Sequence, residues 1–281
     1  MKIGFIGAGN VGCSLGRYFR FHQLEVAGYY SRTAESAKEA AQLTKTAQFD
    51  TIEELVKTCD TLFLTVPDGQ IGPVWNQIKA FPIEGKSICH CSGSLSTEIF
   101  SDIHETGAYG YSIHPMFPFN SKTISYESLQ EALITVEGCE EGRDEMVRLF
   151  ESFGNTVKVI EANAKTAYHA AAVMVSNQVV ALFEMATDLL SDCGFSEEEA
   201  LMAFKPLALK NLNNILAVGT TKALTGPVER NDVQTIEKHL QVFDDEQKDV
   251  YKACSKMLMH ITKRKYPERN ENMMKELLEE K

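Results

Sequence analysis

Three glycines near the start of the chain have the spacing of a phosphate-binding turn. Gly7, Gly9 and Gly12 follow an apolar run at residues 3–6 and precede an amphipathic helical pattern, and a second apolar run covers residues 26–30. In a strand–turn–helix–strand unit these glycines permit the tight turn, the approach of a pyrophosphate to the backbone, and close helix packing. The free N–H groups at the helix start then bind phosphate oxygens. We therefore expect a dinucleotide to bind at Gly7, Ala8, Gly9, Asn10, Val11 and Gly12.

The residues after the second apolar run indicate which dinucleotide binds. An NAD site usually has an acidic residue about 20 positions after the glycines, where it binds the ribose 2′-hydroxyl. This chain has Ser31, Arg32 and Thr33 at that point, and no acid. A guanidinium pairs with a phosphate, and hydroxyl groups donate hydrogen bonds to it. The alternative is a solvated surface arginine, but the missing acid and the added base both favour NADP(H).

Two further turns follow predicted strands. Val66 ends an apolar run at residues 61–66 and Pro67 follows it, and we expect the cofactor to pass these two residues. We interpret the next residue, Asp68, as a structural cap of the following helix. Ser92 and Ser94 lie in a Ser-Gly-Ser turn after the strand predicted at 87–91. Such a turn offers N–H and hydroxyl groups to a substrate oxygen, or it simply caps a helix.

Three residues near residue 170 form a polar stripe at helical spacing. Lys165, His169 and Ser176 share one face of a predicted helix rich in Ala and Val, and Asn177 lies at the margin of that face. A lysine near a helix N-terminus has its charged form disfavoured, which makes it a better proton exchanger. The alternative is a solvated helix edge. We favour a functional stripe that lines a site.

A histidine at the end of another predicted strand is a further candidate for proton transfer. His114 lies in Ser-Ile-His-Pro, and an imidazole there can exchange a proton near neutral pH. The alternative is a loop histidine that is hydrogen-bonded to backbone.

The candidate residues lie in two predicted domains of different fold class. Strand and helix patterns alternate up to about residue 161, which predicts an α/β domain with a mostly parallel, doubly wound sheet at residues 1–161. From residue 162 to 281 only helical patterns occur, so we expect an all-α domain. It begins with one long helix at 164–192, has a capping box at residues 196–199 and a cap at Asp232, and ends in a solvated charged helix.

Composition excludes several classes of protein. The chain has 281 residues, 44% hydrophobic and 24% charged, with a net charge of −11, which argues against a nucleic-acid partner. Seven scattered cysteines indicate reduced thiols in a cytoplasmic protein. Cys89-His90-Cys91 alternates across a strand and has no second ligand cluster, so we expect no metal site. We also expect no signal peptide and no membrane-spanning segment.

Six blocks together resemble a known family. GAGNVG, TVPD, HCSGSLS, SIHPMFPF, AKTAYHAAAVMVSN and ALTGPVERND occur in the order and spacing of Rossmann-like proteins with a DUF2520 C-terminal domain. That family is regarded as NADP oxidoreductases or F420-dependent-like proteins. It belongs to the 6-phosphogluconate dehydrogenase-like clan, with pyrroline-5-carboxylate reductase, ketopantoate reductase and the β-hydroxyacid dehydrogenases.

The resemblance carries expectations about single residues. Dehydrogenases of the clan often place a catalytic Lys early in the first helix of the α domain and an Asn one turn later; Lys165 matches the Lys, whereas His169 stands where the Asn is expected. In the last block the family usually has Gly at Asn231. The neighbouring Arg230 is a candidate anchor for a substrate carboxylate or phosphate, or it forms a salt bridge that closes the loop.

The sequence as a whole predicts an NADP(H)-dependent oxidoreductase that transfers hydride to or from a small polar, anionic substrate. Lys165, His169 and His114 would handle the proton, Ser92 and Ser94 would bind substrate oxygens, and Ser176, Asn177 and Arg230 would complete the substrate site. Alternatives are a prephenate-dehydrogenase-like or imine-reductase-like activity, and a non-catalytic NADP(H)-sensing protein. Because the long apolar helix has more apolar surface than its neighbours cover, and because clan members pair through this domain, we expect a homodimer.

Overall fold

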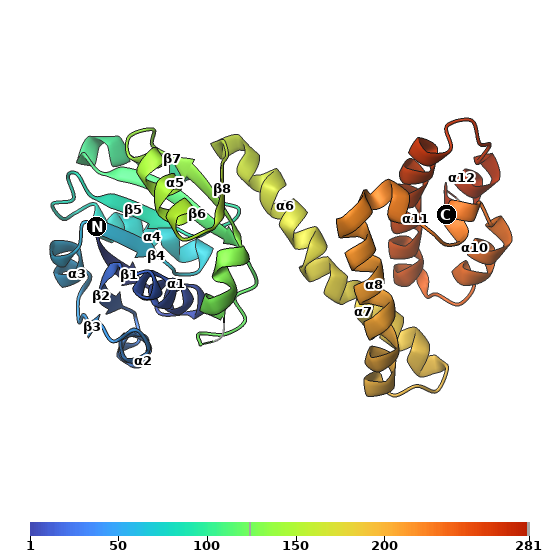
Figure 1. The fold of residues 1–281 in the computed structure, drawn as a ribbon, viewed down its shortest axis with the longest axis horizontal. Helices are drawn as coiled ribbons and strands as arrows, with labels where there is room; N and C mark the ends of the chain where they lie inside the picture. The colour runs from blue at the N-terminus through green and yellow to red at the C-terminus, as the bar shows by residue number, and fades with distance from the viewer. Residues whose placement is uncertain (124, 280–281) are drawn as a thin grey trace. The chain divides into compact units, whose positions relative to one another are not determined.

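The computed structural model describes residues 1–123 and 125–279, which form two compact units, Met1–Ser176 and Asn177–Lys281. The first unit contains the sheet and also helix α6 (Lys165–Val175), and the second unit is helical. The sequence-based division after residue 161 stays a prediction. Figure 1 gives the course of the chain.

The first unit is built on one sheet with the order β3-β2-β1-β4-β5-β6-β7-β8. All strand pairs are parallel except β6–β7, which is antiparallel, so the predicted doubly wound, mostly parallel sheet is confirmed. The strands are β1 (Lys2–Ile6), β2 (Glu25–Tyr30), β3 (Ala47–Gln48), β4 (Thr61–Leu64), β5 (Ser87–His90), β6 (Tyr109–Met116), β7 (Leu133–Gly138) and β8 (Thr156–Val159).

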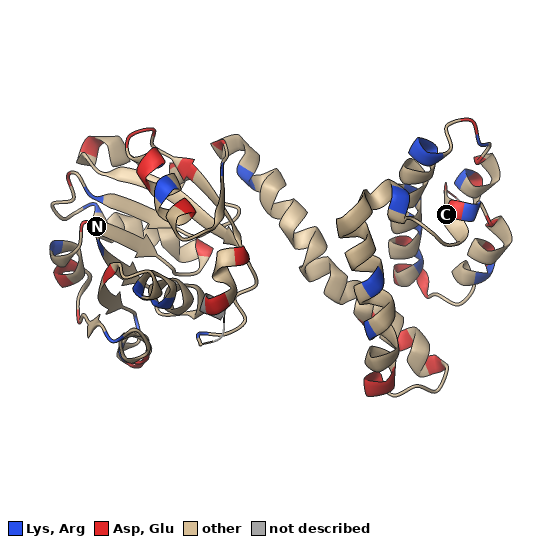
Figure 2. Cartoon of the chain, viewed as in Figure 1, with Lys and Arg blue, Asp and Glu red and all other residues tan. Residues whose placement is uncertain are grey.

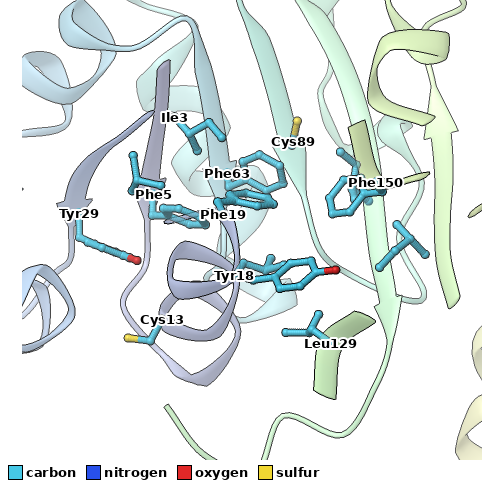
Figure 3. Packing of buried hydrophobic residues seen from close by; sticks show 14 of the residues in the cluster. Ile3, Phe5, Cys13, Tyr18, Phe19, Tyr29, Phe63, Cys89, Leu129 and Phe150 are labelled. Carbon is cyan, nitrogen blue, oxygen red and sulfur yellow. The ribbon is translucent and has the colours of Figure 1, made fainter. Parts of the chain in front are cut away.

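Helices cover both faces of this sheet because successive strand residues point to opposite sides. Phe5 and Phe63 pack in one apolar cluster with α1 (Asn10–Phe21), α2 (Ala34–Thr44) and α5 (Arg143–Ser152), as Figure 3 shows in part. Their neighbours Ile6 and Leu64 belong to a second cluster with α3 (Ile52–Thr58) and α4 (Asp68–Ile78). Short 3-10 turns complete the unit at η1 (Thr97–Ile99), η2 (Ile103–Thr106), η3 (Ser125–Glu131) and η4 (Ala162–Ala164).

The second unit contains α7 (Asn177–Asp192), α8 (Glu197–Ala223), α9 (Pro227–Arg230), α10 (Val233–Leu240), α11 (Asp245–Lys265) and α12 (Asn272–Glu279). The predicted capping box at Ser196 and Glu199 is present, and Asp232 caps α10 through the N–H of Thr235. The terminal helix was expected to be solvated, and this was wrong. Met274 and Leu278 of α12 are buried with Ile236 of α10, because the apolar residues of this short helix share one face.

The single helix predicted at 164–192 is two helices in the structure, α6 and α7. Ser176 between them has φ −117° and ψ −77°, and its hydroxyl donates to the carbonyl of Ala172 at 2.7 Å. A hydroxyl that bonds back to the preceding turn competes with the helical ladder, which gives a local reason for the interruption.

The stretch Ala162–Asp192 contains an 18-residue window with a mean hydropathy of 1.3, so by length and composition alone it could cross a membrane. The expectation of no membrane-spanning segment stays a prediction. Length and composition are weak evidence for a membrane, since the core helix of a soluble protein meets the same criterion. Beyond Lys165 the sequence of α6 contains no Lys, Arg, Asp or Glu, and Figure 2 draws the rest of this helix in tan.

Candidate functional site

The glycine turn has the geometry that a bound dinucleotide requires. Gly7 has φ +111°, and a Cβ there would lie 2.5 Å from the carbonyl oxygen of Thr65. A Cβ on Gly12 would lie 2.5 Å from Thr65 Oγ1, so the helix packs directly on the end of β4. Gly9, by contrast, would place a Cβ in open space. It caps α1 without a side-chain hydrogen bond and without an acid in the first turn, which leaves the helix N–H groups for an anion.

A cavity of about 410 Å³ extends from this turn. It is lined by residues from the ends of three strands: Gly7, Ala8 and Gly9 after β1, Ser31, Arg32 and Thr33 after β2, and Thr65, Val66 and Pro67 after β4. Because β2, β1, β4 and β5 are neighbours in that order, an extended dinucleotide with its adenosine at β2 points its nicotinamide toward β4 and β5. Arg32 is exposed and forms no salt bridge with any described residue.

The turn after β5 is bound to the loop after β4 through a carboxylate. Asp68 Oδ2 accepts hydrogen bonds from Ser92 Oγ at 2.7 Å and Ser94 Oγ at 3.2 Å. Asp68 was interpreted as a helix cap, and this was wrong, because the N-cap of α4 is Pro67 and makes no side-chain hydrogen bond. Ser92 Oγ also accepts from the N–H groups of Ser94 and Leu95, so it closes the turn on itself. The alternative of a helix cap in this turn was wrong, because the next helical element, η1, has Ser96 as its N-cap and no side-chain hydrogen bond there.

Alternation along β6 and β7 creates a polar face beside this turn. His114 lies opposite Thr135, and Ser112 lies opposite Glu137. The apolar neighbours Ile113 and Val136 point into the core on the other face. His114 was expected at the end of its strand, and this was wrong, since β6 continues to Met116 under the antiparallel pairing with β7.

Lys165 is buried against this polar face, with 1% of its surface exposed. Its Nζ donates to the carbonyl of Ser92 at 2.8 Å and to Ser112 Oγ at 2.7 Å. Burial lowers the pKa of Lys165 to about 8, against the opposing effect of the Glu137 charge. Both hydrogen bonds of the Lys165 ammonium go to protein atoms. The ammonium therefore links the turn after β5, at Ser92, to strand β6, at Ser112.

Two imidazoles converge above Gly93. A Cβ on Gly93 would lie 2.4 Å from His169 Nδ1 and 2.9 Å from His114 Nε2. The other ring nitrogen of His114, Nδ1, is 2.8 Å from the hydroxyl of Tyr168. His169 Nδ1 is buried and has no hydrogen-bond partner among the described residues.

Burial determines the protonation states of His114 and Tyr168. It lowers the pKa of His114 to about 4, and the positive charge of Lys165 acts in the same direction. Burial raises the pKa of Tyr168. His114 is therefore neutral at pH 7 and Tyr168 retains its proton. Either partner can donate in the bond between Tyr168 and Nδ1, and the tautomer in which Tyr168 donates has the imidazole proton on Nε2, the nitrogen that faces Gly93.

The structure thus gathers four predicted residues of the first unit, Ser92, His114, Lys165 and His169. The helical stripe is divided, because Lys165 is buried while Ser176 hydrogen-bonds to its own helix. Asn177 and Arg230 belong to the second unit, where Arg230 is exposed. The salt bridge that closes its loop is made by the neighbouring Glu229 with Lys265 at 2.8 Å, and not by Arg230.

Three polar residues of the site were missed by sequence reasoning: Asp68, Glu137 and Tyr168. The sequence contained an indication of Glu137. Residues 135–137, Thr-Val-Glu, place an apolar residue between two polar ones, as residues 112–114, Ser-Ile-His, do, and this is the pattern of a strand with one polar face. Glu137 accepts from the N–H and hydroxyl of Thr97 at 2.9 and 2.7 Å. Tyr168 carried no such signal, since its partner is remote in sequence.

Comparison with known proteins agrees with this architecture. The model of a Rossmann-like domain matches residues 1–115, and the model named Domain of unknown function (DUF2520) matches residues 132–258. No curated protein matches the chain. Protein TM1727 from Thermotoga maritima is 27% identical, with a TM-score of 0.72 over 94% of this chain and 99% of that chain.

Two more distant structures share the fold. A Bacteroides fragilis protein that is provisionally named an NADP oxidoreductase is 21% identical, with a TM-score of 0.76 over 92% of this chain and 98% of that one. Pyrroline carboxylate reductase from Plasmodium falciparum, solved with NADP bound, is 14% identical, with a TM-score of 0.62 over 97% and 98%. The chain therefore consists of a Rossmann-like domain followed by a DUF2520 domain, in agreement with the family resemblance of its sequence motifs.

Proposed function

We propose that this protein is an NADP(H)-dependent oxidoreductase that transfers hydride between the nicotinamide and a small polar substrate. The observation that carries the proposal is the position of the imidazole pair. The dinucleotide groove runs from Arg32 to Pro67, and the next residue, Asp68, is hydrogen-bonded to the turn that contains Gly93. His114 and His169 direct ring nitrogens to that glycine.

Reduction of a C=O or C=N group requires a hydride on carbon and a proton on the heteroatom. The bound NADPH would supply the hydride and leave as NADP⁺. Nδ1 of His114 is paired with the hydroxyl of Tyr168, and in the tautomer in which Tyr168 is the donor His114 carries its proton on Nε2. From Nε2 it donates a hydrogen bond to the heteroatom and orients the double bond. His169, whose Nδ1 has no protein partner among the described residues, exchanges the proton with that heteroatom. Oxidation follows the same path in reverse.

Lys165 has a positioning role in this proposal. Its hydrogen bonds hold Ser92 and Ser112, and through Ser92 they fix the turn that carries Gly93 and Ser94. Ser94 and Asp68 offer polar groups at the edge of the turn to substrate. Ser176, Asn177 and Arg230 stay proposed substrate contacts, with the exposed Arg230 as the cation for an anionic group.

The first experiment compares binding and turnover. Calorimetry should show tighter binding of NADPH than of NADH, and Arg32→Ala should remove most of the difference, since a charge-assisted pair contributes roughly 1.5–3 kcal/mol. Oxidation of NADPH should then be followed against a panel of carbonyl compounds and imines. His169→Phe should lower kcat by about 10²–10⁴-fold without changing the Kd for NADPH.

Two results would contradict the proposal. Equal affinity for NADPH and NADH would remove the cofactor assignment. Tight NADPH binding without turnover across the whole panel would favour the non-catalytic alternative, a protein that senses NADP(H).

We also propose that the second unit forms a homodimer. None of the residues of α7 is buried, and only Ala200 and Ala223 of the 27-residue α8 are buried, although Leu207, Leu212 and Leu216 are large and apolar. An apolar surface of this kind favours burial against a second copy. Sedimentation at micromolar concentration should show a dimer, and Leu212→Glu should weaken it. A stable wild-type monomer would contradict the proposal.

A further inference from the structure

We propose that Lys122 is a second cation for the cofactor's 2′-phosphate, carried to the groove by the segment after β6. This inference rests on the proposed use of NADP(H). Lys122 lines the same cavity as Ser31, Arg32 and Thr33, although it is far from them in the sequence. The ribose 2′-phosphate of a dinucleotide bound along β2 and β1 would enter this corner of the cavity. The guanidinium of an arginine binds a phosphate through two parallel hydrogen bonds, and the ammonium of a neighbouring lysine can add a second, compact positive charge.

Residues 117–123, here called the strap, are fixed to one face of α1. Asn10 Nδ2 donates to the carbonyl of Phe119 at 3.0 Å, and Ser14 Oγ donates to the carbonyl of Ser121 at 3.2 Å. Arg17 donates to the carbonyls of Lys122, at 3.4 Å, and Thr123. Residues 10, 14 and 17 follow one another on one helix face, so each turn of the phosphate-binding helix holds one part of the strap.

This anchoring explains why Lys122 can act as a binding residue. These hydrogen bonds go to backbone carbonyls of the strap, so none of them involves the side chain of Lys122. Asn10, which was expected to contact the cofactor directly, donates its side-chain amide to the strap. The position of Lys122 is therefore set by main-chain contacts that a substitution of its side chain keeps.

The present partner of Lys122 is an acid on α2. Its Nζ lies 2.7 Å from Glu39 Oε2, with side-chain exposures of 26% and 55%. An ion pair this exposed contributes little to stability. A phosphate placed between Lys122 and Arg32 carries more charge than one carboxylate, so it competes successfully for the ammonium. Glu39 keeps the lysine at the groove until the phosphate binds.

The test measures the Kd values of NADPH and NADH for the full-length protein by calorimetry. Lys122→Ala should weaken NADPH by about tenfold and NADH by less than about twofold. Lys38→Ala is the matched control, since Lys38 is an exposed lysine on α2 that does not line the cavity, and it should leave both values unchanged. Glu39→Gln should preserve or tighten NADPH binding.

Two probes separate the phosphate from the rest of the cofactor. Adenosine 2′,5′-bisphosphate should lose affinity in Lys122→Ala, whereas adenosine 5′-monophosphate should not. An unchanged melting temperature would show that the strap remains in place.

The outcomes distinguish this inference from the proposed function. If the wild-type protein prefers NADPH and Lys122→Ala keeps that preference, Lys122 is not a phosphate ligand and the oxidoreductase proposal stands. If the wild-type protein binds NADPH and NADH equally, both the NADP(H) assignment and the role of Lys122 are overturned. Equal losses of NADPH and NADH in Lys122→Ala would also overturn the inference, because they would indicate a general effect on the groove.

Discussion

His114 and His169 approach each other edge to face, with ring centroids 6.1 Å apart and planes at 87°, and both rings bring a nitrogen to the position that a Cβ on Gly93 would occupy. One imidazole comes from a sheet strand and the other from α6. The two imidazoles can pack this closely on residue 93 because it has no side chain. This relationship gives the most direct test of where chemistry takes place.

Gly93→Ala should abolish turnover and preserve cofactor binding. The new Cβ would lie 2.4 Å from His169 Nδ1 and 2.9 Å from His114 Nε2, so it would displace the two imidazoles to which we assign the proton chemistry. Gly69→Ala is a suitable control, since a Cβ there meets nothing within 4 Å. Steady-state kinetics and NADPH calorimetry on both variants check the expectation, and a Gly93→Ala enzyme with normal kcat would disprove it.

Substitutions of two glycines in the phosphate-binding turn should have different effects, one on the stability of the fold and the other on the affinity for NADPH. Gly12→Ala should destabilise the fold by about 1–3 kcal/mol, because its Cβ would press on Thr65 Oγ1 and on the carbonyl of Gly7 at 2.5 and 2.6 Å. Gly9→Ala should leave stability nearly unchanged and weaken NADPH, since its Cβ would occupy the path of the pyrophosphate. Urea unfolding and calorimetry measure the two effects, and the reverse pattern would contradict this account.

Lys165→Met should lower the stability of the fold as well as the activity. It would leave the Ser92 carbonyl and Ser112 Oγ without their donor, and buried Glu137 without its nearby cation. Breaking such a buried charge arrangement costs roughly 3–5 kcal/mol. Urea unfolding at pH 7 measures this loss. A variant of wild-type stability with a reduced kcat would show instead that Lys165 acts directly on the substrate.

Acid should destabilise the first unit through His90. This buried side chain accepts from the N–H of Ser92, and burial lowers its pKa from 6.5 to about 4. Between these values the unfolded chain binds a proton that the folded protein does not. The stabilisation is therefore complete above pH 6.5 and is lost as the pH falls through 4.

His90→Asn keeps an acceptor for the Ser92 N–H and removes this titration. The pH dependence of the free energy of unfolding between pH 6.5 and 4 should then flatten by up to about 1.4 kcal/mol per pH unit. The exposed His104→Asn serves as the control. An unchanged slope in His90→Asn would assign the acid sensitivity to other groups.

Local sequence determined the Rossmann-like half of this protein. The spacing of Gly7, Gly9 and Gly12, the continuous apolar runs of β1 and β4, and Arg32 just after β2 are all visible in short stretches of the chain. Backbone sterics at Gly7, with φ +111°, and the burial of β1 on both faces leave few alternatives. The capping box at Ser196 could be read for the same reason, since its bonds join residues three positions apart.

The tertiary structure decided what each polar side chain does. Helical periodicity placed Lys165 and His169 on one face, but it could not say that Lys165 is buried on β6 while His169 faces Gly93. That outcome depends on the antiparallel pairing of β6 with β7 and on the packing of α6 against their polar face. Lys122 reaches the groove in the same way, through strap contacts more than a hundred residues from the helix they touch. Sequence patterns give the direction of a side chain relative to its own element, whereas burial, pKa and partners arise only when elements distant in the chain pack together.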